Sequence, residues 1–164
     1  MRPADRARRG IAYVPQGREI FPLLTVEENL RTGFAPLPRD QRSVPDDVFS
    51  LFPVLQNMLR RRGGDLSGGQ QQQLAIGRAL VMRPRLLLLD EPVAGMTDIE
   101  TQQTAELLKE INREHTVVVV EHDMTFVRDL GVKVTCLHEG SVLAEGSIDQ
   151  VSSDERVIEV YLGR

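Results

Sequence analysis

The chain alternates between short apolar runs and longer segments whose apolar residues recur every three or four positions. Residues 10–14 form a short apolar run that ends before Pro15, which predicts a strand. Residues 86–89 are apolar throughout, which fits a strand covered on both faces, and residues 116–120, all β-branched, predict a second strand. Residues 99–114 have helical periodicity. Strand, helix and strand at this spacing predict a βαβ unit with parallel strands.

Start and stop signals indicate further elements. Thr25 has the features of a helix N-cap, because two glutamates follow it in what would be the first turn. Residues 36–47 are rich in Pro, Arg and Asp and predict a loop, and residues 133–138 and 141–145 predict a hairpin. Pro53 is expected to interrupt a helix. The other predicted helices span residues 23–30, 48–59, 70–82, 124–130 and 149–162.

These elements describe an α/β core interrupted by a helical insert. The 164 residues are enough for one domain with its own core. The core is expected at residues 10–16 and 84–145, the insert at about 22–82, and a helical tail at 146–164.

Composition narrows the classes of function. With 24 acidic and 20 basic residues the formal net charge is −4, so no basic field favours nucleic acid. Arginine clusters at 6–9 and 60–62 could contact phosphates, but solvated surface is favoured. Cys136 is the only cysteine, which excludes an internal disulfide. Without a signal peptide after Met1 or a roughly 20-residue apolar run, we expect a cytoplasmic protein that meets the membrane through a partner.

A glycine-containing loop precedes the helix expected at 70–82. Its residues are Leu66, Ser67, Gly68, Gly69 and Gln70. Glycines let the backbone approach a ligand, and the helix that follows directs free N–H groups and its positive dipole end at the same place. The alternative is a loop with an ordinary N-cap. The full string, ahead of an apolar strand that ends in two carboxylates, favours a phosphate site.

Two carboxylates, Asp90 and Glu91, end the second strand. Open parallel sheets bind ligands at the carboxyl ends of their strands. If the chain turns after Asp90, one carboxylate can hold Mg²⁺ and the other can orient or deprotonate an attacking water. His122 follows the neighbouring strand and is expected to donate to a terminal phosphate. Gln16 follows the first strand and could contact metal or water.

Together these motifs resemble those of ATP-binding cassette (ABC) ATPases. Residues 66–70 resemble the signature motif, Asp90 and Glu91 resemble the Walker B aspartate and catalytic carboxylate, Gln16 resembles the Q-loop glutamine, and His122 resembles the switch histidine. The resemblance implies an α/β fold, a P-loop NTPase-like (RecA-like) parallel sheet core with an inserted helical subdomain. It also implies ATP and Mg²⁺ as cofactors.

The resemblance also implies roles and partners. Asp90, through water, and Gln16 would bind Mg²⁺, Glu91 would act as base, and Gln16 and His122 would sense the γ-phosphate. Two ATPase subunits would form a head-to-tail dimer, in which residues 66–70 of one contact ATP held by the other. Transmembrane permease subunits would hold the chain at the cytoplasmic face of the plasma membrane. A periplasmic substrate-binding protein would act through the permease, and no nucleic acid is expected as a partner.

The family's P-loop, Gly-x-x-x-x-Gly-Lys-Ser/Thr, does not occur in these 164 residues. The only lysines, Lys109 and Lys133, do not follow a glycine. We therefore expect an N-terminally truncated cassette that is inactive as an isolated chain. In addition, Thr97, with Asp98 beside it, stands where the family usually has its D-loop aspartate.

Local resemblances narrow the family further. Residues 10–22 resemble one of the two ATPase subunits of branched-chain amino acid and urea importers, and residues 93–97, 121–124 and 157–164 resemble the other, especially the urea type. We therefore predict such an importer subunit, with a possible join of two paralogues near residues 90–93. The alternatives are a catalytically silent half-site that donates its signature loop to a P-loop-bearing partner, a truncated or chimeric gene product, and a soluble ATPase acting on DNA or ribosomes.

Overall fold

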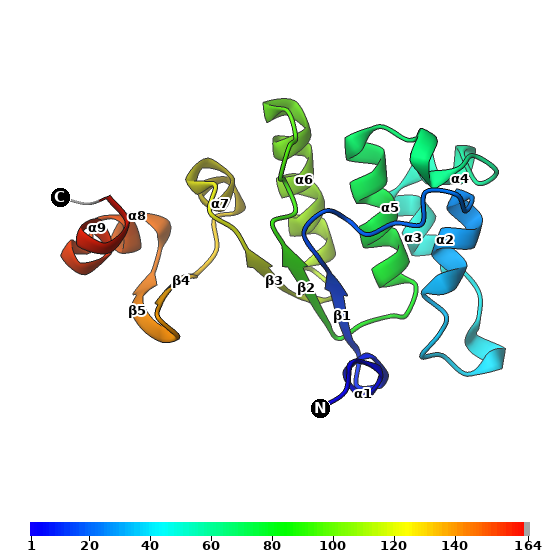
Figure 1. The fold of residues 1–164 in the computed structure, drawn as a ribbon, viewed down its shortest axis with the longest axis horizontal. Helices are drawn as coiled ribbons and strands as arrows, with labels where there is room; N and C mark the ends of the chain where they lie inside the picture. The colour runs from blue at the N-terminus through cyan, green and yellow to red at the C-terminus, as the bar shows by residue number, and fades with distance from the viewer. Residues whose placement is uncertain (163–164) are drawn as a thin grey trace. The chain divides into compact units, whose positions relative to one another are not determined.

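The structure, a computed structural model, describes residues 1–162 (Figure 1). The chain packs into two compact units, one spanning Met1–Val120 and the other beginning at Glu121. The partition into an insert at 22–82, a core at 10–16 and 84–145, and a tail at 146–164 stays a prediction. The last two residues of that tail lie outside the described part of the chain. Within residues 1–162, no helix has both the length and the apolar character needed to cross a bilayer.

The first unit contains a three-stranded parallel sheet in the order β1-β2-β3. Its strands are β1 (Ile11–Val14), β2 (Leu86–Asp90) and β3 (Thr116–Val120). Tyr13 lies opposite Leu88 in the β1–β2 register. The sheet confirms the three predicted strands and the parallel βαβ unit.

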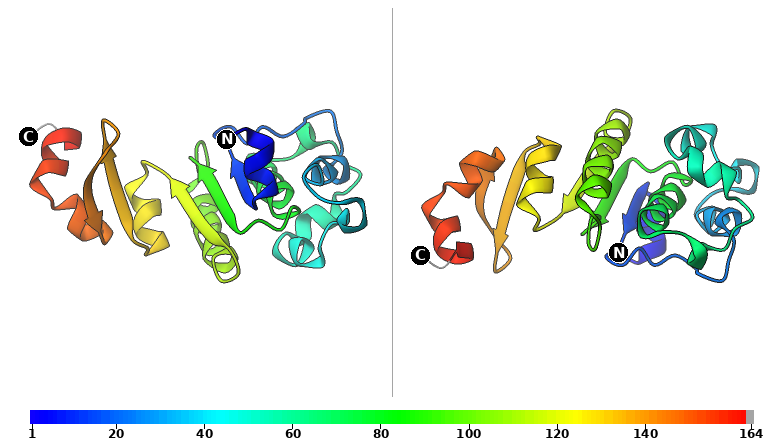
Figure 2. Two further views of the ribbon diagram at one scale, coloured as in Figure 1. Left: turned by 90° about the horizontal axis from the view of Figure 1, so that it is seen from below. Right: turned by 90° about the horizontal axis from the view of Figure 1, so that it is seen from above.

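The two faces of this sheet differ in burial. Leu87 and Leu89 of β2 are fully buried, and Figure 2 shows the helices α5 (Gly68–Leu80) and α6 (Asp98–Ile111) on one side of the sheet. On the other face Val118 and Val120 of β3 are 43% and 53% exposed. In β2, Leu86 and Leu88 are only partly buried, so the expectation that residues 86–89 are covered on both faces holds for one face only. Strand β3 is the edge of this sheet, with a single strand neighbour.

The predicted helical elements of the first unit are present, with shifted ends. Phe52 separates two short helices, which confirms the interruption expected at Pro53. The loop expected at 36–47 contains a short 3₁₀ helix, and a six-residue helix near the N-terminus was not predicted. Besides α5 and α6, the helices are α1 (Pro3–Arg8), α2 (Val26–Thr32), η1 (Arg39–Gln41), α3 (Asp46–Leu51), α4 (Pro53–Asn57) and η2 (Gly63–Asp65).

Close helix packing and one buried amide hold the helical part of this unit together. A Cβ on Gly77 of α5 would lie 3.3–3.5 Å from side-chain atoms of Leu55, Leu30 and Phe52, so this helix face is in van der Waals contact. Asn29 is fully buried; its Oδ1 accepts from the Phe21 N–H at 2.8 Å, and its Nδ2 donates to three backbone carbonyls. This asparagine fixes the loop that precedes α2, because its polar atoms satisfy the buried backbone there.

The second unit contains a hairpin and three helices. The hairpin confirms the prediction, with Glu139 and Gly140 at positive φ in a two-residue turn. The tail is not one helix: Asp154 Oδ1 accepts from the Arg156 N–H at 2.9 Å and starts a new helix. The elements are α7 (Met124–Leu130), β4 (Val134–His138), β5 (Ser141–Gly146), α8 (Ile148–Ser152) and α9 (Glu155–Leu162).

Candidate nucleotide site

The chain turns sharply directly after β2. Glu91 has a φ of +44°, a left-handed backbone conformation that is uncommon outside glycine. Its N–H donates to the carbonyl oxygen of Val120 at 2.9 Å, which ties the turn to the end of β3. Strained residues of this kind concentrate at functional sites. Asp90 is the last residue of β2 and Glu91 lies in the turn, which fits the different chemical roles predicted for them.

Asp90 is held by a side chain from the neighbouring strand. The Tyr13 hydroxyl donates to Asp90 Oδ2 at 2.9 Å. The hydrogen bond to the negatively charged carboxylate raises the pKa of Tyr13 above its usual value, and partial desolvation adds to the shift. The sequence analysis did not identify Tyr13, because the contact depends on the register between β1 and β2.

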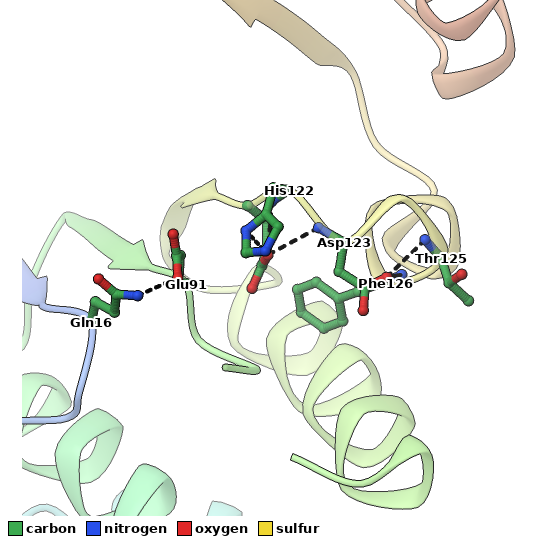
Figure 3. Close-up of polar contacts among 7 residues, drawn as sticks. Gln16, Glu91, His122, Asp123, Thr125 and Phe126 are labelled. Atoms are coloured by element: carbon green, nitrogen blue, oxygen red, sulfur yellow. Dashed lines mark hydrogen bonds and ion pairs between the residues drawn. The ribbon is translucent and has the colours of Figure 1, made fainter. Parts of the chain in front are cut away.

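Glu91 meets the predicted Q-loop glutamine. Gln16 lies two residues after β1, and its Nε2 donates to Glu91 Oε2 (Figure 3). Two residues separated by 75 positions in sequence are thus brought together at the carboxyl ends of β1 and β2. This is the end of a parallel sheet at which ligands bind.

The predicted signature loop forms the N-terminus of α5. Ser67 is its N-cap: Ser67 Oγ accepts from the Gln70 N–H at 3.3 Å, and Gln70 Oε1 accepts from the Ser67 N–H at 3.0 Å. This reciprocal pair is a capping box, so the N-cap considered from the sequence is present. The backbone of Gly68 and Gly69 forms the first helical turn, where N–H groups lack partners within the helix.

Two charged side chains lie against the glycines of this loop. A Cβ on Gly68 would stand 3.3 Å from a guanidinium nitrogen of Arg18, and a Cβ on Gly69 would stand 2.8 Å from Glu100 Oε1. Glu100 also accepts from the N–H and hydroxyl of Thr97, each at 3.0 Å. Hydrogen bonds from Thr97 lower the pKa of Glu100 most, and the Gly69 N–H and the Arg18 charge lower it further.

Arg78 connects the signature helix to the segment after Gln16. Its guanidinium donates to the carbonyl oxygens of Glu19 at 2.9 Å and Arg18 at 3.3 Å, and lies over the Phe21 ring. Burial lowers its pKa. Arg18 and Glu19 have positive φ values of 70° and 45°, so the backbone there is bent into a rarely populated conformation. The sequence analysis missed Arg18, Arg78 and Glu100; only Glu100 had a signal, the Thr-x-x-Glu capping pattern.

His122 belongs to the second unit. Its N–H donates to Glu121 Oε2 at 2.8 Å, and its Nδ1 lies 3.5 Å from the same oxygen. The Glu121 side chain is buried, whereas that of His122 is 79% exposed. Asp123 caps α7 by accepting from the N–H groups of Thr125 and Phe126, as Figure 3 shows. The placement of His122 beside the Asp90 strand stays a prediction.

The donors near the end of β2 suit a hard cation. Asp90 offers a carboxylate, and Gln16 offers an amide oxygen, the kind of ligand that Mg²⁺ takes together with phosphate oxygens. Among the described residues, no three His, Cys, Asp or Glu side chains form a cluster that could hold a metal ion by themselves.

Comparison with known proteins decides the family. A model of the family described as "ABC transporter" matches residues 2–94, more than half of the chain. A model described as "Branched-chain amino acid ATP-binding cassette transporter" matches residues 141–164. The chain belongs to the ABC transporter ATP-binding family. The resemblance given by its motifs is thereby confirmed.

Curated relatives place this ABC chain among transport ATP-binding proteins. The high-affinity branched-chain amino acid transport ATP-binding protein BraG of Pseudomonas aeruginosa is 40% identical over 158 residues, covering 95% of this chain and 68% of the relative. The lipopolysaccharide export system ATP-binding protein LptB of Haemophilus influenzae is 34% identical over 164 residues, covering 97% and 68%. The chain therefore spans about two thirds of these proteins.

Solved ABC cassettes confirm the predicted α/β fold class. The ADP conformation of MJ1267, an ATP-binding cassette of an ABC transporter, matches with a TM-score of 0.81 at 26% identity. The match covers 100% of this chain and 72% of that one. The protein cbiO1 from Clostridium perfringens matches with a TM-score of 0.75 at 28% identity, over 96% and 66%. The chain is an ABC ATP-binding subunit of a family that binds and hydrolyses ATP.

Proposed function

We propose that this chain is the ATP-binding subunit of an importer, in which ATP binding and hydrolysis drive the uptake of branched-chain amino acids or urea. BraG supports the amino acid, as does LivG of Escherichia coli, a branched-chain amino acid transport ATP-binding protein that is 30% identical over 176 residues. The C-terminal family match at 141–164 points the same way. The proposal of urea as the cargo rests on the resemblance of residues 93–97 and 157–164 to the urea-type ATPase subunit. The relatives LptB and ModC are named for lipopolysaccharide export and molybdenum import, so the family alone does not fix the cargo.

The pairing of Gln16 with Glu91 carries this proposal. The hydrogen bond from the Gln16 amide holds the Glu91 carboxylate in one orientation, and a carboxylate oxygen can accept more than one hydrogen bond. Glu91 can therefore accept a proton from the water that attacks the γ-phosphate. Gln16 positions Glu91 through its Nε2 and leaves its amide oxygen to the cation.

Asp90 and Gln16 would hold Mg²⁺, Asp90 through water. The ion would neutralise charge on the phosphates. His122 would donate to the γ-phosphate from the segment after β3, and its 79% exposed side chain leaves it accessible to a ligand.

The loop of Ser67, Gly68 and Gly69, flanked by Leu66 and Gln70, would bind the phosphate of ATP held by a second ATPase subunit. N–H groups in the first turn of α5 suit an anion. The subunits would form a head-to-tail dimer on permease subunits at the cytoplasmic face of the plasma membrane, with a periplasmic binding protein delivering the cargo. Nucleic acid is not proposed as a partner.

The experiment is an ATPase assay with and without a P-loop-bearing subunit. Each lost hydrogen bond to phosphate removes about 1.5–3 kcal/mol, so two such losses weaken ATP binding by more than about a hundredfold. We expect no turnover from these 164 residues alone, and turnover that falls at least about a hundredfold with Glu91→Gln when the family's P-loop segment is joined to the same chain. Turnover by the isolated chain that Glu91→Gln abolishes would contradict the inactivity.

The same experiment separates the second candidate function. In a catalytically silent half-site, the chain donates Ser67 to Gly69 to its partner and contributes no base of its own. Turnover on mixing would then survive Glu91→Gln but not Ser67→Arg, which blocks the loop. The capped glycine loop at the N-terminus of α5 is the observation that favours this alternative.

A further inference from the structure

Tyr13 and Asp90 share the open face of the three-stranded sheet. Tyr13 lies opposite Leu88 in the parallel register, and Asp90 follows two residues later on the same face of β2. The phenol ring therefore extends along the strand toward the carboxyl end. There its hydroxyl reaches Asp90 Oδ2 at 2.9 Å, across 77 positions of sequence.

The Tyr13 hydroxyl is the only side-chain group of residues 1–162 that hydrogen-bonds to Asp90. The tyrosine is 53% exposed, so burial does not force this contact. A phenol O–H pointing at a carboxylate is a charge-assisted hydrogen bond, which is stronger and shorter than a neutral one. The bond uses Oδ2 and leaves Oδ1 as an acceptor with both lone pairs.

We propose that Tyr13 is a positioning residue for Asp90, holding Oδ2 so that Oδ1 faces a divalent cation. The inference rests on the proposed function, in which Asp90 organises the metal. Partners that orient a metal-binding carboxylate change metal affinity by about 10- to 100-fold when removed. Because this pair is half-exposed, we expect the lower end of that range, about tenfold.

The hydrogen bond itself can be tested in the full chain. The sequence has two tyrosines and no tryptophan, so ¹³Cζ labelling of tyrosine gives two NMR signals, and Tyr161→Phe assigns them. Asp90→Asn should shift the Tyr13 signal, because the negative charge opposite the hydroxyl is lost, and should leave the Tyr161 signal in place. A Tyr13 signal that Asp90→Asn does not move would overturn the proposal without touching the proposed function.

The positioning role is tested with Mn²⁺ as the probe, its free concentration measured by electron paramagnetic resonance. Tyr13→Phe keeps the ring and removes only the hydroxyl, and Tyr161→Phe is the matched control. We expect Tyr13→Phe to weaken the binding of Mn²⁺ that depends on Asp90 by about tenfold, at unchanged thermal stability, and the control to leave it unchanged.

Two other results would count against the proposal, and they differ in what they leave standing. If Tyr13→Phe leaves Asp90-dependent Mn²⁺ binding intact, the positioning role is wrong while the proposed function stands. If Mn²⁺ binding in the unsubstituted chain does not respond to Asp90→Asn, the metal role of Asp90 fails, and the role of Tyr13 fails with it.

Discussion

The two parts of the candidate site satisfy their polar groups in different ways. At the end of β2, Asp90 and Glu91 are bound by side chains of Tyr13 and Gln16, which lie 77 and 75 residues away. At the start of α5, Ser67 and Gln70 satisfy each other across three residues. The first arrangement exists only when β1 and β2 pair in register, whereas the second forms with the first helical turn.

Because of this difference, the contacts that position the reactive groups are not the contacts that stabilise the fold. A local capping box stabilises its helix whether or not the rest of the fold is in place. Contacts between strands position reactive groups but add little burial, because both pairs lie at an exposed sheet end. Substitutions at the end of β2 should therefore change function, and those at the start of α5 should also change stability.

The largest effect is expected from Gln16→Ala. Loss of a hydrogen bond to a charged group removes about 1.5–3 kcal/mol, so ATP turnover by the chain joined to the family's P-loop segment should fall about 10- to 100-fold. The midpoint of thermal unfolding should stay within about 1 °C. Gln103→Ala, at an exposed position of α6, is the control. Unchanged turnover in Gln16→Ala would show that the pair with Glu91 is incidental.

Next in size is the removal of the helix caps. Ser67→Ala and Thr97→Ala each delete an N-cap side chain, of α5 and α6, that accepts a backbone N–H. Each should destabilise the chain by about 1 kcal/mol in urea unfolding. Equal losses at both helices, with turnover reduced only by Ser67→Ala, would separate capping from ligand contact. If neither substitution changes the free energy of unfolding, the caps are not formed in solution.

The sequence was sufficient to predict each feature that depends only on residues close to one another along the chain. The three parallel strands, the hairpin and the helix around Thr25 follow from apolar period, turn residues and caps, and the structure has all of them. Gln16 and Glu91 could be named from their motifs, but their contact could not be derived. Tyr13 was missed altogether, because a hydrogen bond between strands depends on a register that no local pattern encodes.

The errors have physical reasons as well. Residues 149–162 have a continuous amphipathic pattern, yet Asp154 accepts a backbone N–H of the next turn and splits the segment in two. Residues 86–89 have the composition of a strand buried on both faces, but Leu86 and Leu88 are only partly buried, because their face of the sheet is left open in the described chain. In both cases a competing local bond or the position in the sheet overrides the periodicity.

A smaller effect should distinguish the two glycines of the signature loop. Gly68→Ala meets only the guanidinium end of the long Arg18 side chain and gains helix propensity, so it should be neutral or stabilising by up to about 0.5–1 kcal/mol. Gly69→Ala places a Cβ 2.8 Å from Glu100 Oε1 and displaces that carboxylate, so it should destabilise. Urea unfolding measures both. If Gly69→Ala still lowers the free energy of unfolding in a chain that already carries Glu100→Ala, the clash with Glu100 is not the cause.

The smallest effect is the acid sensitivity of the two capping-box glutamates, Glu28 and Glu100. Hydrogen bonds from Thr25 and Thr97 lower the pKa of the respective carboxyl from 4.5. A lowered folded-state pKa stabilises the fold above about 4.5, and this contribution is lost as the pH falls through the folded-state value, since the unfolded chain then binds more protons. Glu28→Gln and Glu100→Gln should each flatten the fall in unfolding midpoint below pH 5, unlike the exposed control Glu114→Gln.

Comparison of these two glutamates also isolates the long-range part of the α5 site. The pKa of Glu28 is lowered mainly by its own N-cap and further by the charge of Arg31 on the same helix, whereas that of Glu100 is lowered by its N-cap and also by the Gly69 N–H and the charge of Arg18 from other segments. Charge–charge attraction is screened by salt, but hydrogen bonds are screened far less. The acid response of Glu100 should therefore shrink in 1 M NaCl when Arg18 is present and stay constant in Arg18→Gln. If the acid response of Glu100 changes with salt in the same way in Arg18→Gln as in the unsubstituted chain, Arg18 does not act on the first turn of α5, and that turn is as local as its capping box.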